Sequence, residues 1–285
     1  MGLRRFDSPP SRSVRKVIFS LRLWRTSRQR QHAERKHLEG FSRRHRTANA
    51  SKLQLGCVNA GSMANKIATL TQTIVDDRLD ILTITETWHE CSDSVDLKRV
   101  TPPGYKCIDT ARPLVADVNT HTDRLQNHGG LAVILRDGIK ATKKTLNPTS
   151  TFEHICSHIT VGTSHFILLG VYRPGSKTAT AAFFDELTAV LEQLNSHRCP
   201  FVICGDFNIH VDIHDDPHAV RLVELLQSFD CLQHVTEPTH KAGHTLDLVI
   251  TRSDNKISNL HVGSMVSDHA TVSFEINVEK PLLEQ

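Results

Sequence analysis

The sequence predicts an α/β fold of two packed, mixed β-sheets flanked by helices, a four-layer sandwich. From residue 51 onward, short apolar runs of strand length are separated by turn residues. Several runs between residues 129 and 172 follow one another without a helical pattern between them, which disfavours a strictly alternating βαβ fold. A chain of 285 residues with 39% apolar content can bury the core of such a domain.

Eight apolar runs predict the strands. Each has about the length of an average strand. They are 52–59 (KLQLGCVN), 80–85 (DILTIT), 129–135 (GGLAVIL), 154–160 (HICSHIT), 165–172 (HFILLGVY), 200–206 (PFVICGD), 245–251 (TLDLVIT) and 270–276 (ATVSFEI).

Three apolar stripes predict the helices that cover the sheets. The clearest has the spacing of one helix face and consists of Phe183, Leu187, Val190, Leu191 and Leu194. Weaker stripes lie within 63–74 and 222–229. The segment 91–128 contains TPPG and has little periodicity, so it predicts a long surface loop region.

The charge distribution separates the first fifty residues from the rest. Residues 1–50 carry fourteen Lys or Arg and three acids, a net charge of +11, which leaves −8 for the remainder of a chain with net charge +3. We expect 1–50 to be a basic, disordered arm, 51–278 to be the folded domain and 279–285 to be a tail. The arm could bind nucleic acid, and RRHR (43–46) could direct nuclear import. A mitochondrial transit peptide and a merely solvated leader are the alternatives.

Two further features bear on location. No apolar run reaches the length of a membrane span, and the run 17–24 is interrupted by Arg22, so no membrane partner is expected. The seven cysteines are odd in number and form no CxxC pair, which favours free thiols in a reducing, intracellular compartment. The sequence makes no prediction about oligomeric state.

Polar side chains of catalytic type lie at the ends of several predicted strands, and Asp268 and His269 directly precede the last one. Sheets commonly present catalytic groups at such strand ends. A turn is the competing interpretation of GDFN (205–208) alone, but five strand ends of this kind in one chain favour a shared site. The residues are Asn59, Glu86, Tyr172, Arg173, Asp206, Asn208, Asp268 and His269.

These motifs occur in the order typical of a known superfamily. Asn59, TETW (85–88), VYRPG (171–175), GDFN (205–208), TLDLV (245–249) and SDH (267–269) resemble the endonuclease/exonuclease/phosphatase superfamily. That superfamily includes deoxyribonuclease-I-like and AP-endonuclease-like enzymes. The resemblance covers about residues 51–278 and implies a deoxyribonuclease-I-like sandwich.

The amino-acid sequences of several longer segments resemble the endonuclease domain of LINE-type non-LTR retrotransposons. Among them are VNAGSMANK (58–66) and EPTHKAGHTLDLVIT (237–251). In that family the domain nicks target DNA, and a reverse transcriptase on the same polypeptide extends the new 3′ hydroxyl. No reverse transcriptase is expected within this chain, so it resembles a detached endonuclease module with DNA as its partner and the nucleus as its location.

The resemblance implies a magnesium site, in which Mn²⁺ could replace Mg²⁺. Glu86 is the best single ligand, with Asn59 and Asp268 beside it. Mg²⁺ prefers hard oxygen ligands and keeps several waters, so a sparse shell of this kind suffices.

The resemblance also implies catalytic roles for five residues. Asp206 would orient or deprotonate the attacking water, and Asn208 would bind a phosphoryl oxygen and hold Asp206. His269 would contact the phosphate, with Asp247 fixing its tautomer. Tyr172 would donate to a phosphate oxygen.

Arg173 and Thr239 are expected, more weakly, to contact the substrate phosphate backbone. Two other functions remain open: a phosphatase of the same fold, and a catalytically silent remnant that binds nucleic acid mainly through 1–50.

A histidine series in HVDIHDDPH (210–218) suggests a zinc site, because His210, His214 and His218 recur every four residues. Pro217 would break a helix that joined them, so an exposed acidic loop is the preferred interpretation.

Overall fold

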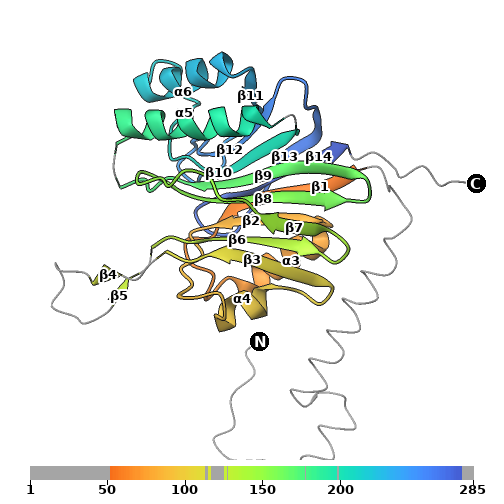
Figure 1. Cartoon of the computed structure of the whole chain (residues 1–285). Coiled ribbons are helices and arrows are strands. Elements are labelled where there is room, and N and C mark those ends of the chain that lie inside the picture. The colour runs from red at the N-terminus through yellow and green to blue at the C-terminus, as the bar shows by residue number, and fades with distance from the viewer. Residues whose placement is uncertain are drawn as a thin grey trace, which may run out of the picture. The chain divides into compact units, whose positions relative to one another are not determined.

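A computed structural model of the chain describes residues 52–112, 115–116, 125–126, 128–176, 178–197 and 199–277. These residues form a sandwich of two six-stranded sheets, shown in Figure 1. The predicted arm 1–50 and the predicted tail 279–285 lie outside the described residues.

The first sheet has both parallel and antiparallel pairs. Its strands are β1 (Lys52–Asn59), β2 (Ile81–Thr85), β3 (Tyr105–Thr110), β6 (Leu131–Arg136), β13 (Ile257–Met265) and β14 (Ala270–Asn277). Their spatial order is β13-β14-β1-β2-β6-β3. β1 and β2 are parallel, and the other neighbours are antiparallel.

The second sheet has the same mixed character. Its strands are β7 (Lys140–Lys143), β8 (Glu153–Val161), β9 (Ser164–Tyr172), β10 (Phe201–Asp206), β11 (Cys231–Gln233) and β12 (Asp247–Arg252). Their order is β11-β12-β10-β9-β8-β7, with β9 and β10 parallel. A small separate pair, β4 (Val115–Ala116) and β5 (Leu125–Gln126), is antiparallel.

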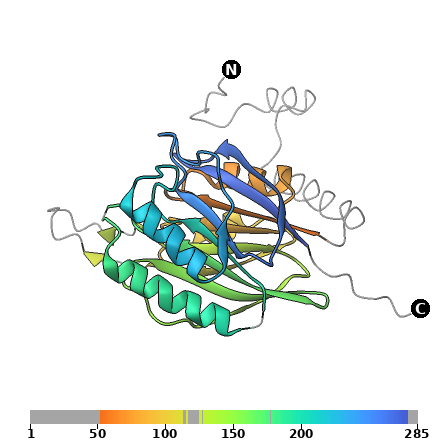
Figure 2. The ribbon, with the colours of Figure 1, turned by 90° about the horizontal axis from the view of Figure 1, so that it is seen from above.

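Helices cover the outer faces of both sheets. They are α3 (Ile67–Asp76), α4 (Val95–Val100), α5 (Ala181–Ser196) and α6 (Pro217–Ser228). α5 and α6 lie along the outside of the second sheet, as Figures 1 and 2 show. α3 and α4 pack on the other sheet through a separate apolar cluster. The predicted four-layer α/β sandwich is therefore confirmed.

The alternation of side chains along the strands separates the apolar layers. On β10, Val202 and Cys204 pack between the sheets, whereas Phe201 and Ile203 pack under α5 and α6. Because successive side chains point to opposite faces of a sheet, the next residue of the inner set is Asp206. The same alternation along the other strands decides which of their polar end residues point between the sheets.

All eight predicted strands and three predicted helices are present, but the loop prediction for 91–128 was wrong in part. That segment contains α4 and β3. β3 is an edge strand with only one fully buried residue, Asp109, so its apolar pattern is weak. The edge strand β7 (KATK) is mostly exposed and was missed for the same reason.

Other sequence expectations can be compared directly. All seven cysteines lie within the described residues and are free thiols, as predicted. α6 begins at Pro217, in the first turn that tolerates proline, so residues 210–216 are not helical. Among the described residues, no helix combines the length and apolar character needed to cross a membrane.

Candidate active site

Strand polarity brings the predicted site residues to one edge of the sandwich. β1, β2, β9 and β10 end there, while β12 and β14 begin there. Asp206 is paired in register with Tyr172 on one side and with Asp247 on the other. Asn59 continues the inward-facing series on β1, so it meets Asp206 across the space between the sheets.

Asn59 is the polar link between the sheets. Its side-chain nitrogen donates to Glu86 Oε1 at 2.8 Å and to Asp206 Oδ2 at 2.7 Å. Its side-chain oxygen accepts from the Gly61 N–H at 2.9 Å. The residue is 1% exposed. In this arrangement Asn59 fixes two carboxylates through its amide nitrogen, and its oxygen is already used by the loop.

The GDFN turn is shaped by close packing and by its own side chains. Gly205 has φ +134°, and a Cβ there would lie 2.1 Å from the Val171 carbonyl oxygen, so only glycine fits. Asn208 has φ +49° and returns its backbone N–H to Asp206 Oδ1 at 2.9 Å. Its side-chain nitrogen donates to Asp206 Oδ2 and to the Arg173 carbonyl. Asp206 is thereby held by donors from both sheets.

Asp206, Asp247 and His269 form a buried polar cluster whose ligand atoms lie within 4.8 Å of one another. Burial and then the charge of Asp247 raise the pKa of Asp206 to about 8. His269 Nδ1 is 2.7 Å from Asp247 Oδ2. Burial opposes charge on His269, but the hydrogen bond and charge of Asp247 outweigh it and raise the pKa of His269 to about 9. The cluster thus contains one acid that holds its proton unusually well and one imidazole that stays charged at neutral pH.

Glu86 and Trp88 are held in strained backbone conformations. Their φ values are +49° and +54°, in the left-handed region that is unfavourable for side chains of this size. Trp88 donates its backbone N–H to the Gly129 carbonyl at 2.8 Å, and the backbone carbonyl of Glu86 accepts from the Ser62 N–H at 2.8 Å. These contacts aim the Glu86 carboxylate at Asn59.

A histidine that the sequence analysis did not single out anchors this loop. The buried His89 ring joins Thr87 Oγ1 at 2.7 Å to Asp109 Oδ2 at 3.0 Å. Asp109 also accepts from Ser92 Oγ at 2.8 Å. Asp109 belongs to β3, an element the sequence did not predict, so its pairing with His89 could not be anticipated.

Tyr172 lies beside Glu86 and is almost fully buried. Burial and then the charge of Glu86 raise the pKa of the Tyr172 hydroxyl, which keeps it protonated. Its hydroxyl lies 3.5 Å from the His128 carbonyl oxygen. A protonated phenol next to the pocket can donate to an anionic ligand.

Arg173 and Thr239 are placed differently from the other site residues. Arg173 is 5% exposed, and its guanidinium donates to the carbonyls of Phe207 and Asn208. Thr239 is fully buried and accepts from the backbone N–H groups of Leu246 and Asp247 through its hydroxyl. Both side chains therefore support the loops around the site in this structure, and phosphate contact by either stays a prediction.

The remaining site residues surround a cavity of about 530 Å³ at the strand ends. Glu86, Asn59, Tyr172, Asn208, Asp268 and His269 all line it, whereas Asp206 and Asp247 are fully buried and are not among the residues that line it. Burial opposes charge on Asp268, but a hydrogen bond from its own backbone, followed by the charges of His269 and Lys241, outweighs burial and lowers the pKa of Asp268. The carboxylates of Glu86 and Asp268 fit the oxygen-rich ligand set of a hard divalent cation such as Mg²⁺, and Asn59 lies beside them.

The cavity also contains residues that the sequence analysis did not assign to it. Trp88 lies against His128, with ring centroids 4.3 Å apart and ring planes inclined at 31°. His240 pairs with His269 in an isolated β-bridge. The sequence signal for His240 was only its position next to Thr239, and nothing linked His128 to Trp88.

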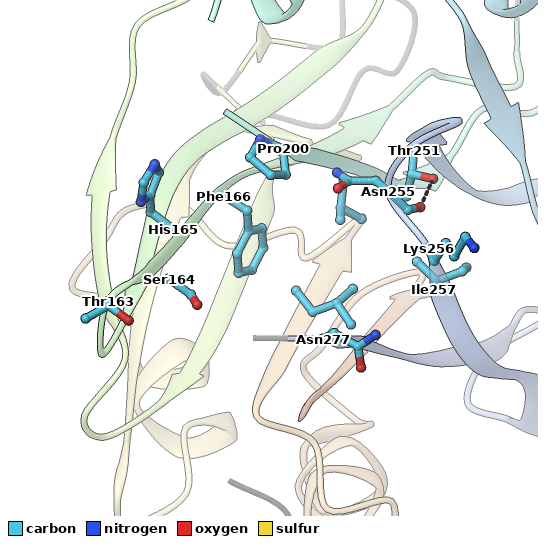
Figure 3. A pocket seen from close by; sticks show the side chains of 12 residues that line it. Thr163, Ser164, His165, Phe166, Pro200, Thr251, Asn255, Lys256, Ile257 and Asn277 are labelled. Carbon is cyan, nitrogen blue, oxygen red and sulfur yellow. Dashed lines mark hydrogen bonds between the residues drawn. The ribbon is translucent and has the colours of Figure 1, made fainter. Parts of the chain in front are cut away.

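A second cavity, of about 300 Å³, lies at the opposite ends of the strands (Figure 3). His165 and Phe166 line it at the start of β9, and Asn277 lines it at the end of β14. Figure 3 shows the Thr251–Asn255 hydrogen bond at its edge. None of its lining residues is acidic, so it offers no second set of carboxylates.

Comparison with solved structures supports the fold. The endonuclease domain of TRAS1, a telomere-specific non-LTR retrotransposon, has a TM-score of 0.59 and 15% identity, covering 80% of this chain and 100% of that domain. The AP endonuclease LMAP from Leishmania major has a TM-score of 0.62 and 12% identity, covering 81% of this chain and 90% of that enzyme. The 3′ phosphatase NExo from Neisseria, bound to product DNA hairpin, has a TM-score of 0.56 and 16% identity, covering 79% of this chain and 99% of that enzyme. At these identities the likeness shows the fold alone.

Sequence comparison gives the family. A search of curated protein sequences found no match. The model of the endonuclease/exonuclease/phosphatase family matches residues 55–269, which is most of the chain and spans every site residue discussed above. The chain therefore belongs to the endonuclease/exonuclease/phosphatase family.

Proposed function

We propose that this protein is a Mg²⁺-dependent phosphodiesterase that nicks DNA, an endonuclease of the non-LTR retrotransposon type. The observation that carries the proposal is the buried cluster of Asp206, Asp247 and His269 beneath a cavity lined by Glu86, Asn59 and Asp268. Cleavage of a phosphodiester requires a positioned water, neutralisation of growing negative charge and a stabilised leaving oxygen. The cluster and the cavity contain a residue type suited to each task.

The metal would be held by Glu86 and Asp268, with Asn59 beside them, and Mn²⁺ could replace Mg²⁺. When bound, the ion supplies Lewis-acid stabilisation of the phosphoryl group. Asn59 already holds Glu86 by a 2.8 Å hydrogen bond, so one ligand is oriented in advance. Preorganised ligands of this kind reduce the reorganisation needed at the moment of reaction.

Asp206 would position the attacking water and accept its proton. Its pKa of about 8 is suited to a general base that works slightly above neutral pH. The two donors of Asn208 hold the carboxylate in place. Asn208 also lines the cavity, where it would bind a phosphoryl oxygen.

His269 and Tyr172 would contact the phosphate as donors. With a pKa of about 9, His269 carries a positive charge at neutral pH. Asp247 fixes the ring through Nδ1, which leaves Nε2 as the donor for a non-bridging oxygen. Tyr172 keeps its proton and would add a second hydrogen bond.

A phosphatase acting on a phosphomonoester is the second candidate, because a 3′ phosphatase is among the structural neighbours. A covalently closed circular duplex has no strand end and no phosphomonoester. Conversion of supercoiled plasmid to the nicked circle by the full chain would support the endonuclease. Release of inorganic phosphate from a 3′-phosphorylated oligonucleotide, with the circle left intact, would instead support the phosphatase.

Residues 1–50 are proposed to strengthen DNA binding and to direct the protein to the nucleus. Their +11 charge would attract a phosphate backbone that the −8 remainder repels. Removing the arm should weaken DNA binding and flatten its salt dependence. If the protein is a catalytically silent remnant, removing the arm should weaken DNA binding in the same way, but Asp206→Ala should affect no reaction.

A further inference from the structure

Two loops at the rim of the cavity lie side by side and bring three metal-ligating side chains together. His240 comes from the loop after β11, and Asp268 and His269 come from the turn before β14. Backbone hydrogen bonds fasten the loops: Lys241 N–H donates to the Asp268 carbonyl at 2.8 Å, and Ala270 N–H donates to the Thr239 carbonyl at 2.7 Å. The three side chains are therefore held by two fixed segments.

The ligand atoms of His240, Asp268 and His269 lie within 4.8 Å of one another. His240 Nε2 is 3.8 Å from Asp268 Oδ2. The His240 and His269 rings are 4.8 Å apart between centroids and inclined at 61°. Tetrahedral zinc with bonds of about 2.0–2.2 Å needs ligand atoms roughly 3.3–3.6 Å apart. The 3.8 Å between His240 Nε2 and Asp268 Oδ2 is close to that spacing.

His269 also has the supporting contact that metal-binding histidines usually have. Its Nδ1 faces Asp247 Oδ2 at 2.7 Å, which leaves Nε2 as the ligand atom. A carboxylate behind the imidazole fixes the ring and strengthens it as a ligand. The Asp247 side chain is completely buried, so this support is rigid.

Asp268 can act as a ligand together with His240 and His269 while its side chain stays in the cavity. Oδ1 lies on the side of Gly61, 3.8 Å from the place of a Cβ on that glycine, whereas Oδ2 faces His240. Lys241 Nζ is 3.5 Å from the same Oδ2 and would compete with a cation. Its side chain is 68% exposed, so it can turn into solvent when an ion arrives.

We infer that His240, Asp268 and His269 form a second metal site, which binds an ion of the Zn²⁺ class. Two imidazoles and one carboxylate match the ligand preference of zinc and not that of Mg²⁺, which takes oxygen. Three protein ligands leave a fourth position open for water. An ion here takes the place of the proton on His269 Nε2, which is released to solvent, so zinc should inhibit the reaction while Mg²⁺ supports it.

The test is a Zn²⁺ titration of the full chain against a chromophoric chelator in the absence of Mg²⁺. We expect His240→Ala to lower the affinity of the tightest site at least tenfold, and His240→Gln, which keeps the side-chain size, to do the same. The matched control is His244→Ala, because His244 lies on the same loop but pairs with Asp212. Equal Zn²⁺ affinity in the parent and in both His240 variants would overturn the site.

Nicking activity provides the second measurement, and only this part rests on the proposed function. Zn²⁺ should inhibit nicking by the parent and by His244→Ala in Mg²⁺ buffer, and His240→Ala should need at least tenfold more Zn²⁺. If Zn²⁺ binds as expected but no protein nicks DNA, the site stands and the proposed function fails. Identical inhibition of the parent and of His240→Ala would overturn the inhibitory role.

Discussion

Replacing His89 with alanine should weaken both the fold and the binding of the catalytic metal. The ring is almost completely buried and joins Thr87 to Asp109. Removing the ring takes one hydrogen-bond partner from the neutral Thr87 hydroxyl and one from the largely buried Asp109 carboxylate. A lost hydrogen bond contributes about 0.5–1.5 kcal/mol between neutral groups and about 1.5–3 kcal/mol when one group is charged. We therefore expect a loss of roughly 3 kcal/mol in the free energy of unfolding.

The same anchor holds the strained loop. Glu86 and Trp88 each occupy the left-handed region, at roughly 1–2 kcal/mol per residue. The strain of about 2–4 kcal/mol is thus comparable to the contribution of the anchor. When the anchor is lost, the loop should relax and Glu86 should leave its place beside Asn59. Loss of an outer contact of a metal ligand typically lowers metal affinity by about 10–100-fold.

Two measurements on the full chain test this reasoning. Guanidinium unfolding gives the stability, and the Mg²⁺ concentration for half-maximal nicking gives the metal requirement. His234→Ala is the control, because His234 is half-buried and bonds Thr251 on the second sheet at 2.8 Å. We expect both variants to lose stability but only His89→Ala to need more Mg²⁺. An unchanged Mg²⁺ requirement in a destabilised His89→Ala would refute the link between this histidine and Glu86.

Three further predictions concern the buried cluster. First, kcat/KM for nicking should rise with pH as Asp206 loses its proton near pH 8 and fall as His269 loses its proton near pH 9. A higher Mg²⁺ concentration should move the acidic limb of this profile to lower pH. A flat profile would contradict these roles. Second, the folded protein binds an extra proton between the unfolded pKa of about 4 and the folded pKa of about 8 at Asp206, so its stability falls as pH rises through that window. Asp206→Asn should therefore raise the Tm in EDTA, by an amount that grows from pH 4 to pH 8, and a Tm difference independent of pH would argue against a raised pKa. Third, Asp247→Asn should lower the pKa of His269, shift the alkaline limb to lower pH and reduce kcat by about 10²–10⁴-fold, whereas an unchanged alkaline limb would mean that Asp247 does not hold the charge on His269.

The fold was predictable because its central strands are apolar and regular. β1, β2, β9 and β10 are buried along nearly their whole length, so their sequences contain the full strand signal. The edge strands β3 and β7 have one buried residue between them and carry little of that signal. Their existence depends on pairing with β6 and β8, and the pattern within each edge strand does not contain that pairing.

The site was predictable where residues follow strands directly. Strand alternation predicts that Asp206 faces inward, and the family motifs predict its neighbours. The contacts made between elements could not be read from the sequence. Phosphate contact by Arg173 stays a prediction, and the sequence did not indicate that its guanidinium holds the GDFN turn through the Phe207 and Asn208 carbonyls. Metal binding by Asn59 stays a prediction, and the sequence did not indicate that its amide nitrogen ties Glu86 to Asp206.

The most direct test of the account is single-turnover conversion of supercoiled plasmid by the full chain in Mg²⁺ and in EDTA, beside Asp206→Ala and His269→Ala. The account predicts nicking by the parent in Mg²⁺ only, and at least a hundredfold slower nicking by each variant when circular dichroism shows it to be folded. Nicking at the parent rate by either folded variant, or none by a folded parent in Mg²⁺ or Mn²⁺, would contradict it.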